Sequence, residues 1–353
     1  MEANPCDSVK ASSDCLENIE SWVVLRMCTI NFMSKSSLPQ NAKAMGILRN
    51  EFSWSKSRNE TLQSCPRRYW FHYYGSWGGW DWQSDPRTRE IYVLKQLHNR
   101  FAWIGVQVHK VLEELLHHLR KSKSLPNYQS VAENLQNRLR QDYRDSRDAK
   151  YRLQPKRFIG LVEHEYQLPV NDEEWRALAT QAQTCVENFY RLPLLNQLKD
   201  LDYSKWLELE ELNYFQIDGC KIWVSLDACY RSDDQIVLLD WKTGKSHEAD
   251  HSLQMGIYAM YTSEKWGIQP DLILLKEVFL ATGKTREYNS KSLDLEGVQN
   301  YVKESIQQMQ TLLSRPEQNH AEESNFSFTD DTTQCAKCNF RKVCPKWHAG
   351  DSE

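Results

Sequence analysis

The sequence lacks long apolar runs. No stretch of about eighteen or more consecutive apolar residues occurs, so we expect no transmembrane helix. The moderately apolar segment 19–33 is interrupted by Arg26 and has no small-residue cleavage site, which argues against a signal peptide and makes a cytoplasmic protein the default expectation. A Gly-x4-Gly-Lys-[Ser/Thr] phosphate-binding loop is also absent, so the chain shows no nucleotide-driven motor of its own.

Net charge is small as well. The 44 lysines and arginines nearly balance 48 aspartates and glutamates, and the resulting −4 does not by itself favour a nucleic-acid partner. The distribution is uneven, because residues 51–160 hold 20 basic side chains against 11 acidic ones. Such a basic segment with interleaved aromatic residues is compatible with binding a phosphate backbone, although a charged run also serves as a solvated face.

Hydrophobic patterning divides the chain into four parts. Residues 1–45 are rich in serine and asparagine without periodicity, which predicts a disordered N-terminal tail and makes Met45 a candidate start. A helical part, an α/β core and a cysteine-rich segment are then expected at 46–205, 206–315 and 316–353. Within the helical part, helices are expected at 53–74, at 89–122 with a break near Gly105, at 127–150 and at 172–199.

The α/β core is expected from alternating and apolar runs. Segments 206–217 and 221–232 meet at Asp218-Gly219, a strong hairpin signal. The third strand, 235–244, contains the unbroken run Ile-Val-Leu-Leu, which is typical of a central strand buried on both faces. A helix, a strand, a strand continuing the sheet and a final helix follow at 251–267, 271–282, 284–290 and 291–315. This order predicts an α/β fold with a helical insertion before its sheet.

Polar residues gather at the exits of two of these strands. Asp227 lies near the end of the second strand, and Asp240 and Lys242 share one side of the third because side chains alternate along a strand. Two carboxylates and a lysine converging there would hold Mg²⁺ or Mn²⁺ beside a scissile phosphate. Taken alone, Asp-x-Lys is a common tripeptide, and an aspartate at a strand end usually forms a turn.

Four motifs in order make the sequence resemble the RecB-like branch of the PD-(D/E)XK nuclease superfamily, which includes the exonucleases of CRISPR adaptation and AddB-type subunits. They are Val-His-Lys-Val-Leu-Glu at 108–113, Ser-Leu-Asp at 225–227, Asp-Trp-Lys-Thr-Gly at 240–244 and Gln-x3-Tyr at 254–258, and the resemblance spans roughly 53–347. It implies a restriction-endonuclease-like core, with a central mixed sheet flanked by helices, a helical insertion and a cluster-binding C-terminal segment.

The resemblance also assigns roles to single residues. It implies that His109, Asp227, Asp240 and the carbonyl of Trp241 ligate the catalytic cation, and that Lys242 assists the nucleophile. A neutral histidine ligand favours Mn²⁺ somewhat over Mg²⁺. Gln254 and Tyr258 share a helix face, from which they would contact DNA phosphate or brace the site. Without the family, His109 would be read as a core histidine.

The cysteines pose a separate question. Cys335, Cys338 and Cys344 form Cys-x2-Cys-x5-Cys, one ligand short of a tetrahedral sulfur site. In the iron–sulfur members of the family that the chain resembles, an N-terminal cysteine joins three C-terminal ones, and Cys65 occupies that place. Four thiolates suit a [4Fe–4S] cluster or Zn²⁺, and the resemblance favours iron–sulfur. Its expected role is to staple the two ends of the domain.

Three functions follow as hypotheses. The first is a metal-dependent DNA nuclease, an exonuclease or single-strand nuclease, whose partners are DNA and a helicase or other protein subunit, with no membrane. The second is a non-cutting DNA-binding subunit of a repair or defence complex, and the third is a zinc-stapled regulatory module. A loop rich in tryptophan at 75–90 adds two interpretations: base stacking, or clamping of the loop onto the helices.

Overall fold

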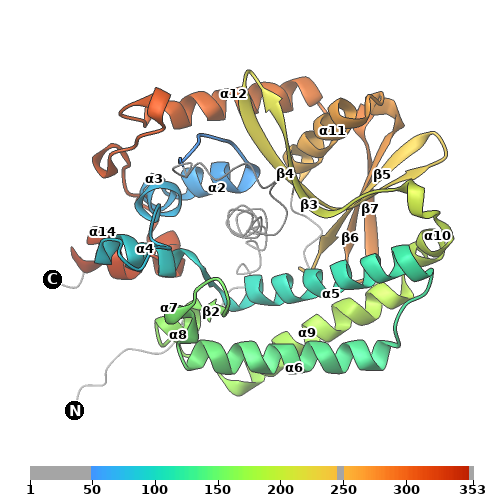
Figure 1. Cartoon of the computed structure of the whole chain (residues 1–353), viewed down its shortest axis with the longest axis horizontal. Helices are drawn as coiled ribbons and strands as arrows, with labels where there is room; N and C mark the ends of the chain where they lie inside the picture. The colour runs from blue at the N-terminus through green and yellow to red at the C-terminus, as the bar shows by residue number, and fades with distance from the viewer. Residues whose placement is uncertain (1–48, 245–249, 350–353) are drawn as a thin grey trace, which may run out of the picture.

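The computed structural model describes residues 49–244 and 250–349; the predicted tail at 1–45 lies outside them, as do Cys6, Cys15 and Cys28. Its centre is a five-stranded sheet in the order β3-β4-β5-β6-β7 (Figure 1). The bounds are β3 Trp206–Ile217, β4 Cys220–Ser232, β5 Gln235–Lys242, β6 Ile273–Phe279 and β7 Lys284–Asn289. Within this sheet the β5–β6 pair is parallel and the other three pairs are antiparallel, so the predicted α/β class with a central mixed sheet is confirmed.

The predicted hairpin and central strand are both present. Asp218 and Gly219 form the two-residue turn with positive φ angles of 49° and 79°, the conformation that Asp-Gly favours between twisted strands. β5 occupies the middle of the sheet, and its residues from Ile236 to Trp241 are all buried. Because β5 and β6 are parallel, the chain needs a crossover between them, which helix α11 (Ser252–Trp266) supplies.

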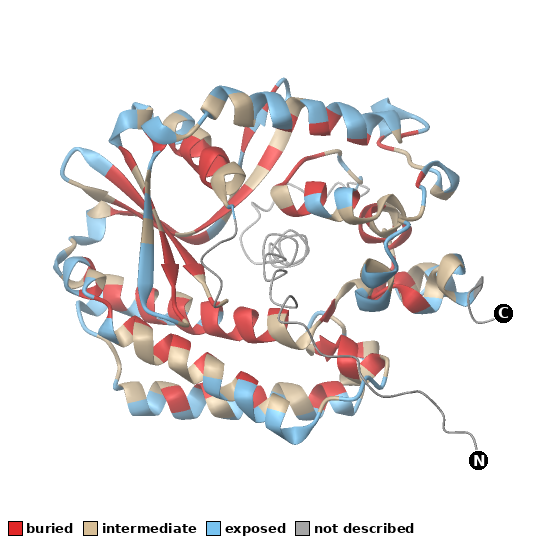
Figure 2. Ribbon diagram, turned by 180° about the vertical axis from the view of Figure 1, so that it is seen from behind, coloured by how far each residue is buried: buried red, intermediate tan, exposed pale blue. Residues whose placement is uncertain are grey.

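Helices cover both faces of the sheet. Helices α5 (Arg100–Ser122) and α9 (Asp172–Arg191) pack against one face, and α6 (Tyr128–Arg147) packs outside them. Helices α11 and α12 (Leu295–Thr311) cover the other face. Figure 2 shows that much of α5, which lies against the strands, consists of buried residues. The predicted sheet flanked by helices is therefore observed.

A third apolar cluster lies away from the sheet. It joins the N-terminal helices to the C-terminal segment through Phe71, Leu94, Val162 and Phe340, with Cys338 and Cys344 beside them. The elements involved are α3 Pro66–Trp70, the π-helix Phe71–Gly75, α4 Pro86–Lys95, α7 Lys150–Leu153 and α8 Val162–Glu165. Helices α13 Thr332–Lys337 and α14 Pro345–Ala349 flank the C-terminal part of the cluster, whereas α2 Lys56–Ser64 contributes Leu62 to the core under α11 and α12. Residues more than 200 positions apart therefore share one core.

Three expected helices are divided, each for a local reason. The break in 89–122 falls not at Gly105, which is buried inside α5, but at the short strand β1 (Leu97–His98), because Asn99 caps a new helix through the N–H of Ala102. The helix expected at 172–199 ends before Pro193, and α10 (Leu194–Asp200) follows. The helix expected at 53–74 stops at extended Cys65, after which Pro66 opens α3.

Within the described ranges, none of the helices combines the length and the apolarity needed to cross a bilayer.

Buried His98 predicts an acid-sensitive fold. Burial, and then the charge of Lys110, lower the pKa of His98 to about 4, whereas a histidine in an unfolded chain has an ordinary pKa of about 6.5. The unfolded chain therefore binds the extra proton first, so stability is full above about pH 6.5 and falls as the pH drops toward 4, by at most about 1.4 kcal/mol per pH unit. Urea unfolding at pH 7 and pH 5 measures this, and His98→Asn should flatten the dependence. His118→Asn, at an exposed position, should leave it unchanged; equal slopes in all three proteins would contradict the assignment.

Candidate active site

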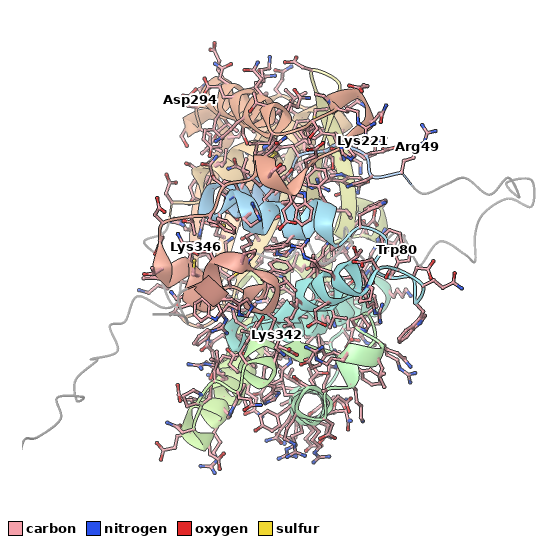
Figure 3. The ribbon with its side chains drawn as sticks, turned by 90° about the vertical axis from the view of Figure 1, so that its left-hand side faces the viewer. Arg49, Trp80, Lys221, Asp294, Lys342 and Lys346 are labelled. Carbon is pink, nitrogen blue, oxygen red and sulfur yellow. The ribbon has the colours of Figure 1, made fainter. Side chains whose placement is uncertain are left out.

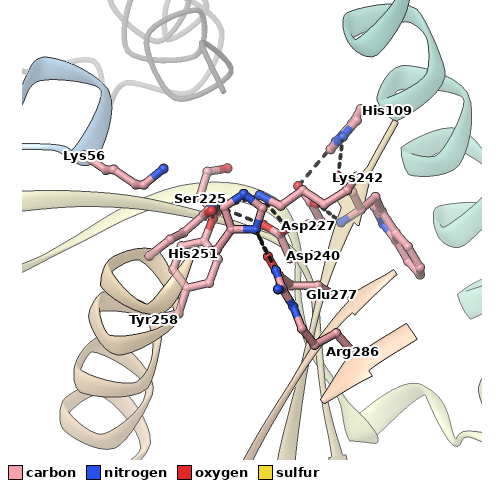
Figure 4. A network of polar contacts seen from close by, with 12 residues as sticks. Lys56, His109, Ser225, Asp227, Asp240, Lys242, His251, Tyr258, Glu277 and Arg286 are labelled. Atoms are coloured by element: carbon pink, nitrogen blue, oxygen red, sulfur yellow. Dashed lines mark hydrogen bonds and ion pairs between the residues drawn. The ribbon is translucent and has the colours of Figure 1, made fainter. Parts of the chain in front are cut away.

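His109, Glu210 and Asp227 form one buried group where α5 crosses the β3–β4 hairpin. One potential ligand atom of each lies within 4.8 Å of the other two. His109 Nδ1 is 3.4 Å from Glu210 Oε1 and 3.4 Å from Asp227 Oδ1, and its Nε2 is 3.0 Å from the Trp241 carbonyl oxygen (Figure 4). The structure thus brings together three predicted ligands, His109, Asp227 and the carbonyl of Trp241.

Glu210 is the ligand candidate that the sequence reasoning missed. It lies opposite Asp227, between the pairs Leu209–Ala228 and Glu211–Leu226. Its φ of 53° breaks the strand geometry, and the hairpin buries different faces on the two sides of this point. The sequence could have revealed that Glu210 lies opposite Asp227. The turn pairs Ile217 with Cys220, and counting seven residues outward from each reaches Glu210 and Asp227.

The charges of this group are strongly coupled. Burial disfavours the imidazolium, but the carboxylates of Asp227 and Glu210 outweigh it and raise the pKa of His109 to about 10. Burial likewise favours neutral Asp227, but His109 and the N–H of Trp241 lower the pKa of Asp227. A proton on His109 therefore balances the two carboxylates, and a bound cation has to displace that proton.

Asp240 and Lys242 form the second half of the site. Lys242 Nζ lies 3.0 Å from Asp240 Oδ2, as expected for two residues on one side of β5. Burial raises the pKa of Asp240; Lys242 opposes the shift, whereas the Asp227 and Glu277 charges add to it. Such a buried carboxyl among like charges is suited to holding a cation.

Gln254 connects the two catalytic candidates of β5 to α11. Its Nε2 donates to Asp240 Oδ1 (3.2 Å) and to the Tyr258 hydroxyl (2.8 Å), and its Oε1 accepts from Lys242 Nζ (2.9 Å). The Tyr258 hydroxyl in turn donates to the carbonyl of Ser225, and burial keeps its pKa well above the usual value. The pair thus braces Lys242 and Asp240, which is one of the two roles expected for it.

Glu277 adds a fourth carboxylate that the sequence did not single out. It pairs with Asp240 across the parallel β5–β6 ladder and is fully buried. Its oxygens accept from Arg286 Nε and the Tyr288 hydroxyl, both at 2.8 Å, and contact His251 Nδ1. Burial opposes ionisation, but His251, Tyr288 and the charge of Lys242 lower the pKa of Glu277 to about 2, so its charge is fixed and already partnered.

The four predicted cluster cysteines gather at the far end of the molecule from the sheet. Burial is the main reason that the pKa values of Cys335 and Cys338 are raised, and the neighbouring Cys65 and Cys344 raise them further. The N–H of Phe340 lies 3.4 Å from Cys338 Sγ. Figure 3 places Lys342 and Lys346 along the same C-terminal segment. Four thiols have the donor chemistry of a cluster or zinc site, but among the described residues only His109, Glu210 and Asp227 place three potential ligand atoms within 4.8 Å of one another.

The tryptophan-rich loop is mostly packed. The ring of Trp80 meets those of Trp77 and Tyr92 edge-on, at 5.1 and 6.3 Å between centroids. A Cβ at Gly79 would lie 2.4 Å from Tyr92 Cβ, so only glycine allows this approach to α4. Trp80 nevertheless remains 37% exposed, and Trp82, which lies beneath the Arg89 guanidinium, is 69% exposed. Of the two interpretations of this loop, clamping onto the helices fits Trp77 and Trp80.

Comparison with known proteins adds the family. The family model of the PD-(D/E)XK nuclease superfamily matches residues 53–345. The chain belongs to the PD-(D/E)XK nuclease superfamily. A search of curated proteins returned no match. Membership in this superfamily implies divalent-metal-dependent nuclease chemistry, and the acidic group around His109 provides a place for the metal.

Removing Glu210 tests its place in this nuclease site. Even outer-shell partners change metal affinity by about 10–100-fold, so Glu210→Gln should raise the Mn²⁺ concentration for half-maximal cleavage at least about tenfold. The matched control is Glu211→Gln, since Glu211 is the next residue but is exposed. A metal titration of cleavage compares the two variants. If they behave alike, Glu210 does not hold the cation.

Proposed function

We propose that the protein is a metal-dependent deoxyribonuclease of the RecB-like branch, acting as an exonuclease or on single strands, and stapled by an iron–sulfur cluster. The supporting observation is the geometry of one site: His109, Glu210 and Asp227 within 4.8 Å of one another, beside the Asp240–Lys242 pair. A superfamily match to residues 53–345 agrees with this chemistry.

The chain's own residues divide the work. His109, Glu210, Asp227 and Asp240, with the carbonyl of Trp241, would hold Mg²⁺ or Mn²⁺; these oxygen and imidazole donors fit either cation. When bound, the cation lowers the pKa of a water molecule and offsets negative charge on the phosphate. Lys242, held by Gln254 and Asp240, orients the attacking water against the scissile phosphodiester.

For the second metal centre we propose a [4Fe–4S] cluster on Cys65, Cys335, Cys338 and Cys344. All-thiolate ligation suits this cluster, and the N–H of Phe340 beside Cys338 supplies the hydrogen bonding that such sulfurs use. Zn²⁺ is the alternative occupant of four thiolates. The role of the cluster would be structural, since the four cysteines come from the two ends of the described chain.

The deciding experiment is cleavage of end-labelled single- and double-stranded DNA by anaerobically purified protein with Mn²⁺, Mg²⁺ or EDTA. Metal-dependent products, absent with EDTA, are expected, and the product ladder reveals polarity. RNA of the same sequence, run in parallel, tests the preference for DNA. A folded, cluster-loaded protein that binds DNA but cuts neither substrate would favour the non-cutting subunit, or an enzyme that requires a helicase or other partner before it acts.

A further inference from the structure

Trp82 is the most exposed of the large apolar side chains in the described part of the chain, at 69%. Two further exposed apolar residues accompany it, since Trp80 is 37% exposed and Leu153, at the end of α7, is 65% exposed. Single apolar residues scattered over a surface are ordinary, but a group assembled from two separate segments marks an interaction site. We call Trp80, Trp82 and Leu153 the loop platform.

Arg89 of α4 holds the loop platform together. Its guanidinium lies over the Trp82 ring, 4.4 Å from the ring centroid, and over the Tyr92 ring at 5.6 Å. Its Nη1 donates to the Gly79 carbonyl at 2.9 Å, and its Nη2 donates to the Leu153 carbonyl at 3.4 Å. These contacts fix the loop against α7 and set Trp82 against Arg89, while most of the Trp82 side chain stays open to solvent. An aromatic ring that is held and exposed in this way is suited to stacking with an unpaired base.

A basic strip adjoins the loop platform. Figure 1 shows α7 between α4 and the C-terminal end of α6, and α7 contacts both helices. The strip consists of three exposed arginines: Arg140, Arg144 and Arg157. The first two are four residues apart, so they share one face of α6. Lys150 of α7 pairs with Asp145 of α6 at 2.6 Å, and the charge of Arg157 also reaches Asp145. The strip therefore runs from α6 to α7, where the platform begins.

The acidic residues in this region leave the basic strip positively charged. Residues 140–157 hold seven lysines and arginines against three aspartates. Two of the aspartates face inward, since Asp145 is buried and Asp142 accepts a hydrogen bond from an indole N–H of α5 at 2.9 Å. The third, Asp148, is exposed, but it pairs with Arg147 at 3.5 Å and not with the strip. Clustered positive charge beside exposed aromatic rings suits a nucleic acid better than it suits a protein surface of mixed charge.

We propose that the loop platform and the basic strip bind single-stranded DNA outside the catalytic site, with a base stacked on Trp82 and phosphates neutralised by Arg144 and Arg157. Stacking on an open ring requires an unpaired base, which favours a single strand over a duplex. The inference rests on the proposed nuclease function and extends it. A strand long enough to occupy this surface and the catalytic site together should bind more tightly than one that occupies either alone.

The test measures binding of labelled single-stranded DNA of increasing length, at several salt concentrations, with Lys242→Ala as the parent protein. Trp82→Ala should weaken the binding of long strands by about 5- to 150-fold, the range for one base stacked on an aromatic ring. The salt dependence should change little, because stacking releases no counterions. Arg144→Gln should instead lower the slope of log affinity against log salt by about 0.7, the share of one phosphate on a single strand. Both losses should grow with the length of the strand.

Two further variants serve as controls. Trp82→Phe keeps an aromatic ring and should retain most of the affinity. Arg176→Gln should bind like the parent, because Arg176 lies on α9, outside the strip, with its side chain 74% exposed and paired with Asp172 at 3.5 Å.

The outcomes separate this surface from the nuclease proposal. If Trp82→Ala and Arg144→Gln bind strands of every length like the parent, the surface does not hold DNA, and a protein partner becomes its candidate occupant. Losses as large for the shortest bound strands as for the longest would also overturn the proposal, since they would place the effect in the catalytic site. Either result leaves the nuclease proposal intact. A parent that binds no DNA of any length would overturn both.

Discussion

Lys242→Ala should reduce metal-dependent DNA cleavage by about 10²- to 10⁴-fold, the range for loss of a positioned group that handles a proton. Lys242 is held in place by Asp240 Oδ2 at 3.0 Å and by Gln254 Oε1 at 2.9 Å. Because the His109 group is untouched, Mn²⁺ binding measured by calorimetry should persist. Single-turnover cleavage of end-labelled DNA supplies the rate.

The control for this prediction lies on the next strand. Lys276 immediately precedes Glu277, the register partner of Asp240, so its side chain points to the opposite face of the sheet. It is paired with Glu287 at 2.7 Å. Lys276→Ala should therefore cut DNA at nearly the normal rate. Equal activity of the Lys242 and Lys276 variants would remove Lys242 from the catalytic machinery.

Cys65→Ala should empty the proposed cluster site and destabilise the fold. Cys65 is the only one of the four cysteines from the N-terminal part, and the proposed cluster would close a loop of 270 residues (335 minus 65). Losing a cross-link of this kind typically costs about 2–5 kcal/mol. The phenylalanine contact between Phe71 and Phe340, 5.2 Å between ring centroids, closes the same loop and limits the loss. Iron content, visible absorption and urea unfolding are the measurements.

Cys220→Ala is the matched variant. Cys220 is a half-buried thiol on β4, and burial raises its pKa to about 11. This change should leave iron and absorption unaltered. Full iron content in Cys65→Ala would show that Cys65 is not a ligand. Stoichiometric zinc in place of iron in the unaltered protein would change the proposed identity of the metal, but the metal would still link the N-terminal and C-terminal cysteines.

Local patterns were sufficient to predict the sheet and part of the site. The Asp-Gly turn set the hairpin, and the apolar run before Asp240 placed β5 at the centre. Alternation along that strand then put Lys242 beside Asp240, because each of these inferences depends on neighbours in sequence. The breaks in the long helices were misplaced where a cap, as at Asn99, or a proline decided the boundary.

Other residues depend on pairings between distant segments. Glu277 looks like any charged residue within an apolar strand until the parallel β5–β6 ladder sets it beside Asp240. Glu210 was accessible in principle, because the hairpin register follows from the turn, but three glutamates in one strand concealed it.

The junction of the chain's two ends has a consequence for synthesis on the ribosome. Arg67 donates to the carbonyl of Phe326 and Trp70 to that of Ala321, so α3 finds these partners 259 and 251 residues further along the chain. Because a nascent chain folds only with segments that have already emerged, α3 cannot complete its packing until Phe326 has been translated. A product truncated before residue 320 would thus lack both contacts.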